Sequence, residues 1–298
     1  MNKSDDTIWG KELPSLESGR TQVVNVSSVR KVSLFRYPGG KTWFVPTARR
    51  WLDHLGDIET FVEPFVGGGI VALSMLYEGR AQRIVLNELD EDVSAVWKTS
   101  LNEDHEWLAE QILEFSCTRE SVAALLATEP VSIKARAFHT IVRNRTNRGG
   151  ILNKGAGAIK AGENGKGIAS RWYPETLVKR LIDIYEHRSG ISFHQGDAFP
   201  VIERFNDAKR AALFIDPPYT ASGKKAGSRL YRHNELDHER LFNLIGQSKT
   251  PSLMTYDDDV GIRELASKNH LEVGLVPMQS THLKKMNELV IGRDLTWL

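Results

Sequence analysis

The fold class of this chain of 298 residues is decided by one segment, Phe61-Val62-Glu63-Pro64-Phe65-Val66-Gly67-Gly68-Gly69-Ile70. It joins an apolar run of strand length to a glycine turn and then to the start of a helix. Glycines accept positive φ and let the backbone approach a ligand, and the following helix N-terminus offers free N–H groups. The spacing lacks the G-x-G-x-x-G pattern of dinucleotide sites, which argues against a nicotinamide dehydrogenase. The segment therefore predicts an α/β fold with a ligand-binding turn after a buried strand.

The same alternation continues on both sides of this segment. Seven apolar runs of strand length are bounded by Gly, Pro, Asn or Asp, at residues 60–65, 83–86, 191–193, 211–215, 252–255, 271–276 and 288–291. Helical patterns lie between several of them, at residues 70–77, 93–101, 175–185 and 238–245. Strand–helix alternation predicts a mainly parallel sheet covered by helices. The short connection before the last run predicts an antiparallel hairpin at one edge.

Two regions break this rhythm and suggest the domain organisation. Residues 1–30 are polar and unpatterned, so we predict a flexible leader, with order beginning near Val32. Residues 102–188 offer helices but no buried strand, and we interpret them as a subdomain inserted into a catalytic domain of residues 31–101 and 189–298. Residues 134–180 hold eleven basic and two acidic side chains, a net charge of +9 where the whole chain has +1. Such a contrast is typical of a phosphate-binding surface, although a solvated basic face is the alternative.

Composition excludes several classes of protein. Hydrophobic residues at 41%, charged residues at 26% and a mean hydropathy of −0.34 are those of a globular protein. Cys117 is the single cysteine, so the chain alone can hold no disulfide, multi-cysteine zinc site or iron–sulfur cluster. No run approaches the roughly 20 apolar residues of a membrane span, and we expect a cytoplasmic protein.

The sharpest chemical signal is Ala211-Ala212-Leu213-Phe214-Ile215-Asp216-Pro217-Pro218-Tyr219, where a buried strand runs into an acid, two prolines and an aromatic. Prolines carry no N–H, so this segment presents carbonyl oxygens and no competing donors beside the carboxylate. Two acceptors can take both N–H bonds of an exocyclic amine and aim its lone pair at an electrophile. Tyr219 can then stack on the flat base that carries the amine. An acidic cap followed by a plain turn is the alternative interpretation.

Two further segments suggest contacts to a ligand. Glu88 follows a strand about 20 residues after the glycines, where an acid can accept hydrogen bonds from ribose hydroxyls; a solvent-facing loop glutamate is the alternative. Residues 35–42 end in Pro-Gly-Gly-Lys-Thr, but Phe35 stands where a phosphate loop needs glycine, so an NTPase is excluded. The turn still delivers Lys41, a cation suited to the carboxylate of an amino-acid-like ligand.

Together these motifs resemble the Dam-type D12 class, alpha group, of DNA adenine-N6 methyltransferases, from about residue 34 to 298. Residues 35–41 are similar to the family's amino-terminal cofactor motif, residues 61–69 to its glycine motif, and residues 216–219 form its D-P-P-Y motif in full. The resemblance implies a Rossmann-like methyltransferase sheet that binds S-adenosylmethionine without a metal. The cofactor candidates that it implies are Tyr37, Lys41, Glu63, Pro64, Phe65, Gly67, Gly69, Glu88, Asp197, Ala198 and Asp216.

The resemblance also implies catalytic and DNA-contacting residues. Its catalytic candidates are Asp216, Pro217, Pro218 and Tyr219. The insert resembles the family's target-recognition region, and the loop at residues 220–234 is interpreted as a mobile DNA-contacting lid. The DNA-contact candidates are Arg143, Asn144, Arg145, Asn147, Arg148, Lys154, Lys160, Arg171, Lys224, Lys225 and Arg229. Residues 255–258 depart from the Ser-Asn-His-type segment of many relatives, and the family's base-reading residues have no clear counterpart, so the recognition sequence stays open.

The resemblance implies that an adenine is flipped out of duplex DNA and methylated directly on N6, leaving S-adenosylhomocysteine. It is compatible with a solitary enzyme or with the modification partner of a restriction endonuclease, as a monomer or weak dimer, in a prokaryote or phage. Two alternatives stay open: an RNA adenine or protein amide N-methyltransferase on the same fold, and a catalytically silent DNA-binding module. Asp216 rather than asparagine, together with the insert, favours adenine in DNA, and the complete D-P-P-Y segment argues against the silent module.

Overall fold

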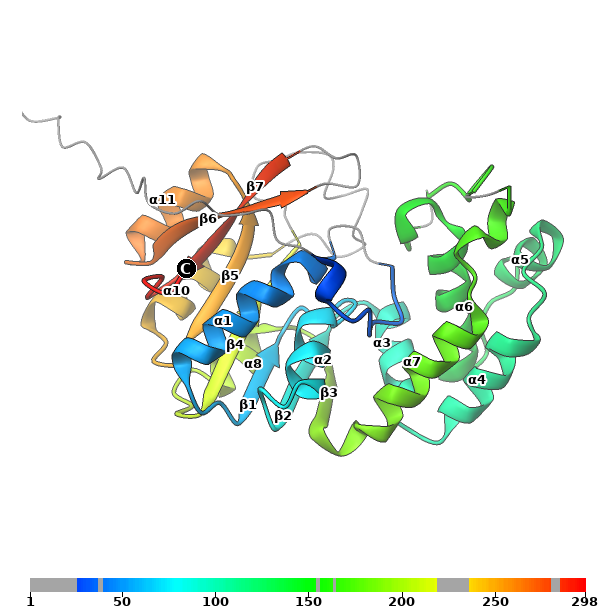
Figure 1. Ribbon diagram of the computed structural model, residues 1–298, viewed down its shortest axis with the longest axis horizontal. Helices are drawn as coiled ribbons and strands as arrows, with labels where there is room; N and C mark the ends of the chain where they lie inside the picture. The colour runs from blue at the N-terminus through cyan, green and yellow to red at the C-terminus, as the bar shows by residue number, and fades with distance from the viewer. Residues whose placement is uncertain (1–25, 37–39, 154–155, 163–164, 219–235, 280–284) are drawn as a thin grey trace, which may run out of the picture.

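The computed structural model describes residues 26–36, 40–153, 156–162, 165–218, 236–279 and 285–298 (Figure 1). Seven strands form one sheet in the order β3-β2-β1-β4-β5-β7-β6. The strands are β1 Thr60–Glu63, β2 Arg83–Glu88, β3 Ile191–Gln195, β4 Ala211–Ile215, β5 Ser252–Asp257, β6 Glu272–Gln279 and β7 Lys285–Gly292. Strands β1 to β5 are parallel, and β7 runs antiparallel to both β5 and β6. The seven predicted strands and the antiparallel edge hairpin are confirmed.

Successive residues of the central strands point to opposite faces of the sheet, and each face is covered by helices. Phe61 belongs to the hydrophobic cluster of one face and its neighbour Val62 to the cluster of the other. All five residues of β4 are buried, as expected for a parallel strand covered on both sides. The helices that bury the first face near the sheet are α1 Val45–Leu55, α2 Ile70–Tyr77 and α3 Glu91–Ser100. The helices of the second face are α8 Phe199–Arg204, α10 His238–Gln247 and α11 Val260–Lys268.

The region between α3 and β3 is helical, as the sequence predicts. It contains α4 Asp104–Glu114, α5 Arg119–Leu126, α6 Ile133–Thr146 and α7 Pro174–Glu186, with 3-10 turns η3 Arg148–Gly150, η4 Gly167–Arg171 and η5 Arg188–Gly190. These helices gather beyond α3 on one side of the sheet (Figure 1). Their buried side chains, such as Leu108, Ile141 and Leu181, belong to the same hydrophobic cluster as the first face of the sheet. The division of the chain into leader, catalytic domain and recognition subdomain stays a prediction.

The packed part of the chain begins earlier than Val32. The turn η1 Val26–Ser28 precedes Val29, which is buried, and Arg30 pairs with Asp183 of α7. A second 3-10 turn, η2 Lys41–Phe44, leads into α1. The predicted lid at residues 220–234 lies outside the described residues. No helix in the described ranges has the length and apolar character that crossing a membrane requires.

Candidate functional site

The candidate site lies at the carboxyl edge of the parallel strands. From β1 the chain order proceeds outward through β2 to β3 on one side and through β4 to β5 on the other, so β1 and β4 meet at the point where the order reverses. In open α/β sheets ligands bind at this switch point. The segments that follow β1, β2 and β4 hold Glu63 to Gly69, Glu88 and Asp216, which the topology therefore brings to one edge.

The glycine turn after β1 is tightly packed. Gly67 and Gly69 have φ of 44° and 62°, a region that favours glycine. A Cβ on Gly69 would lie 2.6 Å from ring atom Cζ2 of Trp97, which comes from α3. The indole Nε1 of Trp97 also donates to the Gly67 carbonyl at 3.0 Å. The turn thus requires glycine at Gly69 for both backbone conformation and space.

Glu88 faces this turn rather than open solvent. Its Oε2 accepts the Gly67 N–H at 2.9 Å, and its Oε1 accepts the Asp90 N–H at 2.9 Å. Burial raises the pKa of Glu88 to about 7, and the Asp90 carboxylate raises it further, while the backbone donors oppose the shift. The alternative of a solvent-facing loop glutamate is wrong, and the predicted ribose contact stays a prediction.

Asn87 is a positioning residue that sequence reasoning missed. Its buried side-chain amide donates to the Pro64 carbonyl at 3.1 Å and to the Gly196 carbonyl at 2.9 Å. One side chain at the end of β2 therefore fixes the chain after β1 and the chain after β3. The next residue, Asp197, is exposed, and its Oδ1 accepts the Phe199 N–H at the start of α8, while Ala198 is buried.

Asp216 lies among donors from distant parts of the chain. Its Oδ1 accepts the Thr255 hydroxyl at 2.8 Å and lies 2.9 Å from the Lys41 ammonium. The two prolines carry no N–H, and the donors that contact this carboxylate come from outside the segment, from Thr255 and Lys41. Thr255 belongs to β5, the neighbouring strand, so its hydroxyl reaches Asp216 through strand pairing that the motif alone does not reveal.

Lys41 contacts two carboxylates of the protein itself. Its Nζ lies 2.9 Å from Asp216 Oδ1 and 2.9 Å from Oε1 of Glu288, a residue of β7. Burial alone would lower the pKa of Lys41, but Asp216 and Glu288 together raise it above its ordinary value. Lys41 was predicted to meet the carboxylate of a ligand, and the contact with Glu288 was not foreseen.

Glu63 adds a third carboxyl group to this neighbourhood. It is buried at the end of β1, and its Oε2 accepts the Ala72 N–H in the first turn of α2 at 3.0 Å. Burial raises the pKa of Glu63 well above its ordinary value, and Asp216 raises it further, whereas the Ala72 N–H and Lys41 lower it. The site therefore holds more acidic than basic groups.

Several predicted DNA-contact residues of the insert are buried and bonded within the chain. The Asn144 side chain accepts the Arg36 N–H at 2.8 Å and donates to the carbonyls of Arg36 and Gly150. Arg145 donates to the Leu34 carbonyl, and buried Asn147 donates to the Ile151 carbonyl. Asn144 and Arg145 therefore join the insert to the segment before Lys41, whereas the Asn147 bond lies within the insert. Arg148 and Lys160 are exposed, and Arg171 is half-buried.

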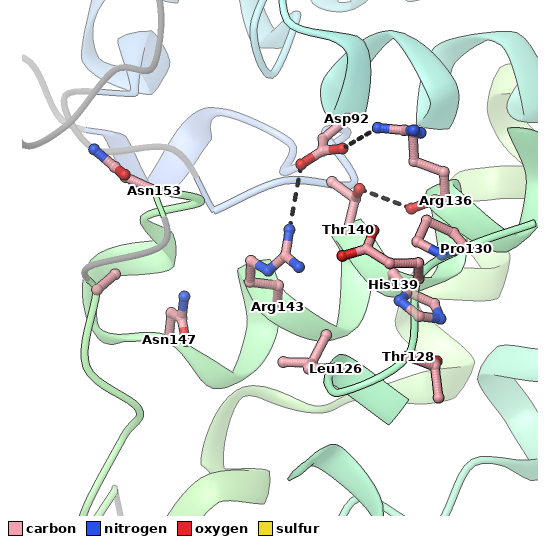
Figure 2. Close-up of a pocket in the computed structure, with 12 residues that line it drawn as sticks. Asp92, Leu126, Thr128, Pro130, Arg136, His139, Thr140, Arg143, Asn147 and Asn153 are labelled. Carbon is pink, nitrogen blue, oxygen red and sulfur yellow. Dashed lines mark hydrogen bonds and ion pairs between the residues drawn. The ribbon is translucent and has the colours of Figure 1, made fainter. Parts of the chain in front are cut away.

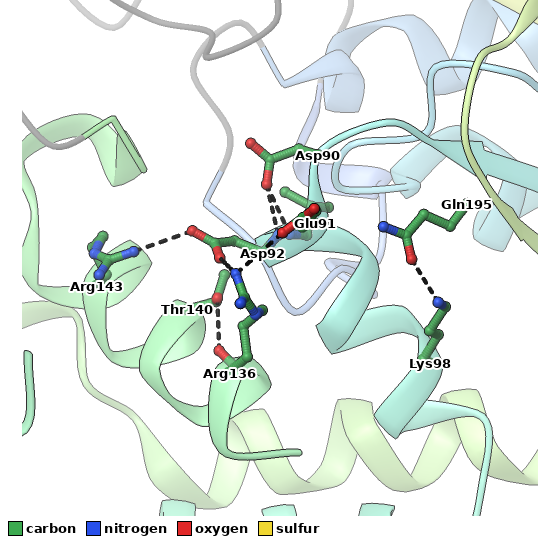
Figure 3. A network of polar contacts seen from close by, with 9 residues as sticks. Asp90, Glu91, Asp92, Lys98, Arg136, Thr140, Arg143 and Gln195 are labelled. Atoms are coloured by element: carbon green, nitrogen blue, oxygen red, sulfur yellow. Dashed lines mark hydrogen bonds and ion pairs between the residues drawn. The ribbon is translucent and has the colours of Figure 1, made fainter. Parts of the chain in front are cut away.

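Part of the basic excess is also balanced internally. Buried Asp92, in the first turn of α3, lies 3.1 Å from Arg136 and 3.2 Å from Arg143 of α6 (Figure 3). Lys134 pairs with Asp104 at 2.9 Å. The charge available to a phosphate backbone is therefore smaller than the sequence count suggests.

A pocket of about 430 Å³ opens beside these pairs (Figure 2). Helix α6 contributes Arg136, His139, Thr140 and Arg143 to its wall, and Asp92 closes one side. Its lining among the described residues includes none of residues 64–69 or 216–218, so it is distinct from the carboxyl-edge site.

The remaining predicted site residues divide into two groups. Pro64 and Pro217 are buried at the carboxyl edge, and Phe65 and Pro218 are half-buried there. Six candidates lie outside the described residues and stay predictions: Tyr37, Lys154, Tyr219, Lys224, Lys225 and Arg229.

The known proteins similar to this chain are methyltransferases. Residues 37–122 match the D12 class N6 adenine-specific DNA methyltransferase family. A DNA N-6-adenine-methyltransferase of Escherichia phage P1 is 27% identical over 252 residues, covering 78% of this chain and 31% of the relative. The type II methyltransferase M.MjaIII of Methanocaldococcus jannaschii is 22% identical over 231 residues, covering 70% of this chain and 76% of the relative. Among solved structures, an rRNA methyltransferase from Streptomyces viridochromogenes has a TM-score of 0.35 at 12% identity, covering 91% of this chain and 93% of its own.

The sheet order, the antiparallel β7 and the glycine turn after β1 define a Rossmann-like methyltransferase fold. Within that class, the similarity found is to the D12 class of N6 adenine-specific DNA methyltransferases, whose family model matches residues 37–122. The chain spans about a third of the length of the phage P1 relative.

Proposed function

We propose that this chain is a site-specific DNA methyltransferase that uses S-adenosylmethionine to methylate N6 of an adenine flipped out of duplex DNA. The observation that carries the proposal is Asp216, which follows buried β4 at the switch point and is held by Thr255 and Lys41. Two prolines follow it, so the acceptors beside the carboxylate are carbonyl oxygens. The match of residues 37–122 to the D12 class of N6 adenine-specific DNA methyltransferases supports the same reaction.

The chemistry of the site fits S-adenosylmethionine. Two carboxyl groups, those of Asp216 and Glu288, each lie 2.9 Å from the ammonium of Lys41. An excess of carboxyl groups favours a cationic ligand over an anionic one. Gly67 and Gly69 keep the turn free of side chains where a ligand would approach. The residues proposed to hold the cofactor here are Glu63, the glycine turn, Glu88 at the ribose, and Asp197 with Ala198 at the adenine.

When bound, the cofactor supplies a sulfonium methyl group, whose bond to sulfur breaks as a bond to N6 forms, leaving a neutral thioether. Asp216 and the Pro217 carbonyl accept the two N–H bonds of the amine and keep its lone pair out of conjugation with the ring. One N6 proton is lost to Asp216 or to water. Alignment and electrostatics account for the rate, and no covalent enzyme intermediate is needed.

The proposed partner is double-stranded DNA, and the insert is proposed to contact its backbone. Exposed basic residues at Arg148, Lys160, Lys166 and Lys179 support this assignment. DNA as the substrate places the enzyme in the cytoplasm of a prokaryotic or phage-infected cell. A role as the modification enzyme of a restriction–modification system is compatible with site-specific methylation.

The test is to incubate purified protein with S-adenosylmethionine and unmethylated genomic DNA, digest the DNA to nucleosides and quantify N6-methyladenosine by mass spectrometry. Sequencing of modified strands then gives the recognition site. We expect N6-methyladenosine at one recurrent short sequence. Methylation of an RNA sample alone, or cofactor binding without methylation of any nucleic acid, would overturn the proposal in favour of an RNA enzyme or a silent binding module.

A further inference from the structure

Glu288 is a buried carboxylate to which the proposed reaction assigns no task. It lies in β7, opposite Asp257 of β5 and Val276 of β6, and only about 5% of its side chain is exposed. Burying a glutamate in a sheet costs stability unless its charge is paired. It pairs with Lys41, which lies 247 residues away in sequence and is equally buried. The pair therefore links the C-terminal hairpin to the turn that precedes α1.

The same ammonium also contacts Asp216, so the three groups form a chain. Lys41 Nζ lies 2.9 Å from both Glu288 Oε1 and Asp216 Oδ1. An ammonium has three N–H donors on a flexible stem, and one carboxylate alone would leave it free to change its contacts. A second carboxylate on its other side restricts it to one position. Lys41 then directs a fixed donor to Oδ1 of Asp216.

Glu288 also changes the net charge of the groups around Asp216. Lys41 with Asp216 alone would be a neutral pair, and the ammonium would withdraw electron density from the carboxylate that must accept the target amine. With Glu288 included, the three ionised groups carry a net charge of −1. Among the described residues, the titratable groups near Asp216 include Glu63 from β1 and Tyr256 from β5, whose pKa is raised by burial and by Asp216. Neither carries a positive charge, and the cation in contact with Glu288 is Lys41.

We propose that Glu288 is a positioning residue for methyl transfer: it holds Lys41 against Asp216 and balances its charge, so that Asp216 keeps both its orientation and its strength as an acceptor. The inference rests on the proposed function, because it assigns Glu288 to the reaction attributed to Asp216. It adds a residue from the C-terminal hairpin to the segments that build the site.

The principal variant is Glu288→Gln, which keeps the size of the side chain and an acceptor oxygen but removes the charge. We expect kcat for adenine methylation to fall about 10- to 100-fold, because the acceptor of the amine is misplaced and weakened, while KM for DNA changes less than about twofold. Glu288→Asp, which keeps the charge, should recover part of kcat. Glu272→Gln removes an exposed carboxylate from the adjacent strand β6 without touching Lys41, and it should retain wild-type kcat.

A double-variant cycle tests whether Glu288 acts through Lys41. If it does, Glu288→Gln lowers kcat in the wild-type background but adds less than about twofold to the loss caused by Lys41→Met. An equal loss in both backgrounds, or a fall in kcat matched by a rise in KM for DNA, would overturn the inference. If Glu288→Gln does not fold, Glu288→Asp takes its place in the same double-variant cycle.

A readout without catalysis separates this inference from the proposed function. Proton exchange of the Lys41 ammonium can be followed by NMR of the ¹⁵N-lysine-labelled protein without ligands, with Lys41→Met to assign the signal. We expect exchange at least several-fold faster in Glu288→Gln than in wild type or Glu272→Gln. Unchanged exchange would overturn the inference even if wild type methylates DNA. Altered exchange with no methylation by wild type would instead contradict the proposed function.

Discussion

At the scale of single residues, the Asp216 carboxylate is held by two contacts. Asp216 Oδ1 is contacted by the Thr255 hydroxyl and the Lys41 ammonium, which come from different parts of the chain. Fixing a carboxylate in this way lowers the cost of reorganisation when the amine arrives. Both contacts fall on Oδ1, one of the two oxygens of this carboxylate.

Asp216→Ala should abolish methyl transfer, with a fall in kcat of at least about 10³-fold, because the charged acceptor of the amine is lost. Cofactor affinity should survive within about threefold, since the glycine turn and Glu88 remain. Calorimetry with S-adenosylmethionine and a methyl-transfer assay measure the two effects separately. Asp257→Asn, an exposed carboxylate at the end of β5, is the matched control and should stay active. Loss of cofactor binding in a folded Asp216→Ala protein would assign Asp216 to the cofactor site instead.

Glu88 should make stability depend on pH. Burial raises its pKa from an ordinary 4.5 to about 7, so between these values the folded chain keeps a proton that the unfolded chain has lost. Its contribution to stability is fully present below about pH 4.5 and is lost as pH rises to about 7. Burial also raises the pKa of Glu63, so this group acts in the same direction.

Urea unfolding of the ligand-free protein between pH 5 and about pH 8 tests this. The free energy of unfolding of wild type should fall as pH rises, and that of Glu88→Gln should fall less steeply. Glu106→Gln, on an exposed face of α4, should follow wild type. If the free energy of unfolding of Glu88→Gln fell with pH as steeply as that of wild type, the raised pKa of Glu88 would be contradicted.

Sequence reasoning found Asp216, Glu88 and the glycines because each stands in a local pattern: a strand followed by an acid, or a run of glycines. It missed the partners. Glu288 reaches Lys41 only because β7 inserts between β5 and β6, and the amide of Asn87 reaches Pro64 and Gly196 only because β2 lies between β1 and β3. Such contacts depend on strand order, which no single segment encodes.

At the scale of elements, the glycine turn is held between β1 and α3. The Trp97 indole both covers Gly69 and donates to the Gly67 carbonyl. Glu88 binds the Gly67 N–H from the end of β2. Three elements therefore determine the shape of one short turn, and a change in any of them should affect cofactor binding.

Gly69→Ala should destabilise the protein by about 1–3 kcal/mol more than Gly79→Ala. Both glycines have positive φ, 62° and 66°, so both variants carry the left-handed backbone cost. Only the Cβ at Gly69 meets Trp97, at 2.6 Å, whereas nothing lies within 4 Å of a Cβ at Gly79. Urea unfolding measures the difference, and calorimetry should show weaker cofactor binding for Gly69→Ala alone. Equal stability of the two variants would refute the packing argument.

The insert is joined to the sheet domain mainly through α3 and α6. Asp92 pairs with Arg136 and Arg143, which lie about one turn and nearly three turns from the start of α6 (Figure 3). Strand and helix positions here were predictable from apolar periodicity. This ion-pair arrangement was not, because Asp92 lies more than 40 residues from its partners and periodicity carries no information about distant charges.

Asp92→Asn should lower the free energy of unfolding by about 1–3 kcal/mol, because a buried carboxylate that pairs with two guanidinium groups is neutralised. Glu91→Gln is the matched control. Glu91 is exposed and lies 3.4 Å from Arg136, so its loss should cost at most about 0.5 kcal/mol. Chemical unfolding of the two variants and of wild type measures the two losses of stability. An equal loss for Asp92→Asn and Glu91→Gln would exclude a specific role for Asp92.

At the scale of the whole molecule, positive charge and the reactive edge are carried by different parts of the chain. The net charge is +1, yet residues 134–180 alone carry +9, so the rest of the chain is acidic overall. Internal pairing with Asp92 and Asp104 reduces the excess in the insert without removing it. Positive charge therefore gathers in residues 134–180, whereas the carboxyl edge holds Asp216 and Glu288 beside Lys41. This division is consistent with the proposed polyanionic substrate and cationic cofactor.

DNA affinity should depend on salt through the exposed basic residues of the insert. Arg148 and Lys160 come from two chain segments that the Asn147–Ala158 bridge holds together, and both are exposed. If each neutralises one phosphate, Arg148→Ala and Lys160→Ala should each lower the magnitude of the slope of log K against log salt by about 1. Lys249→Ala is the control: it is 77% exposed but precedes β5, at the opposite edge of the sheet from Asp216. Fluorescence anisotropy with a duplex at several salt concentrations measures the slopes. Equal slopes for all three variants and wild type would remove these two residues from the DNA interface.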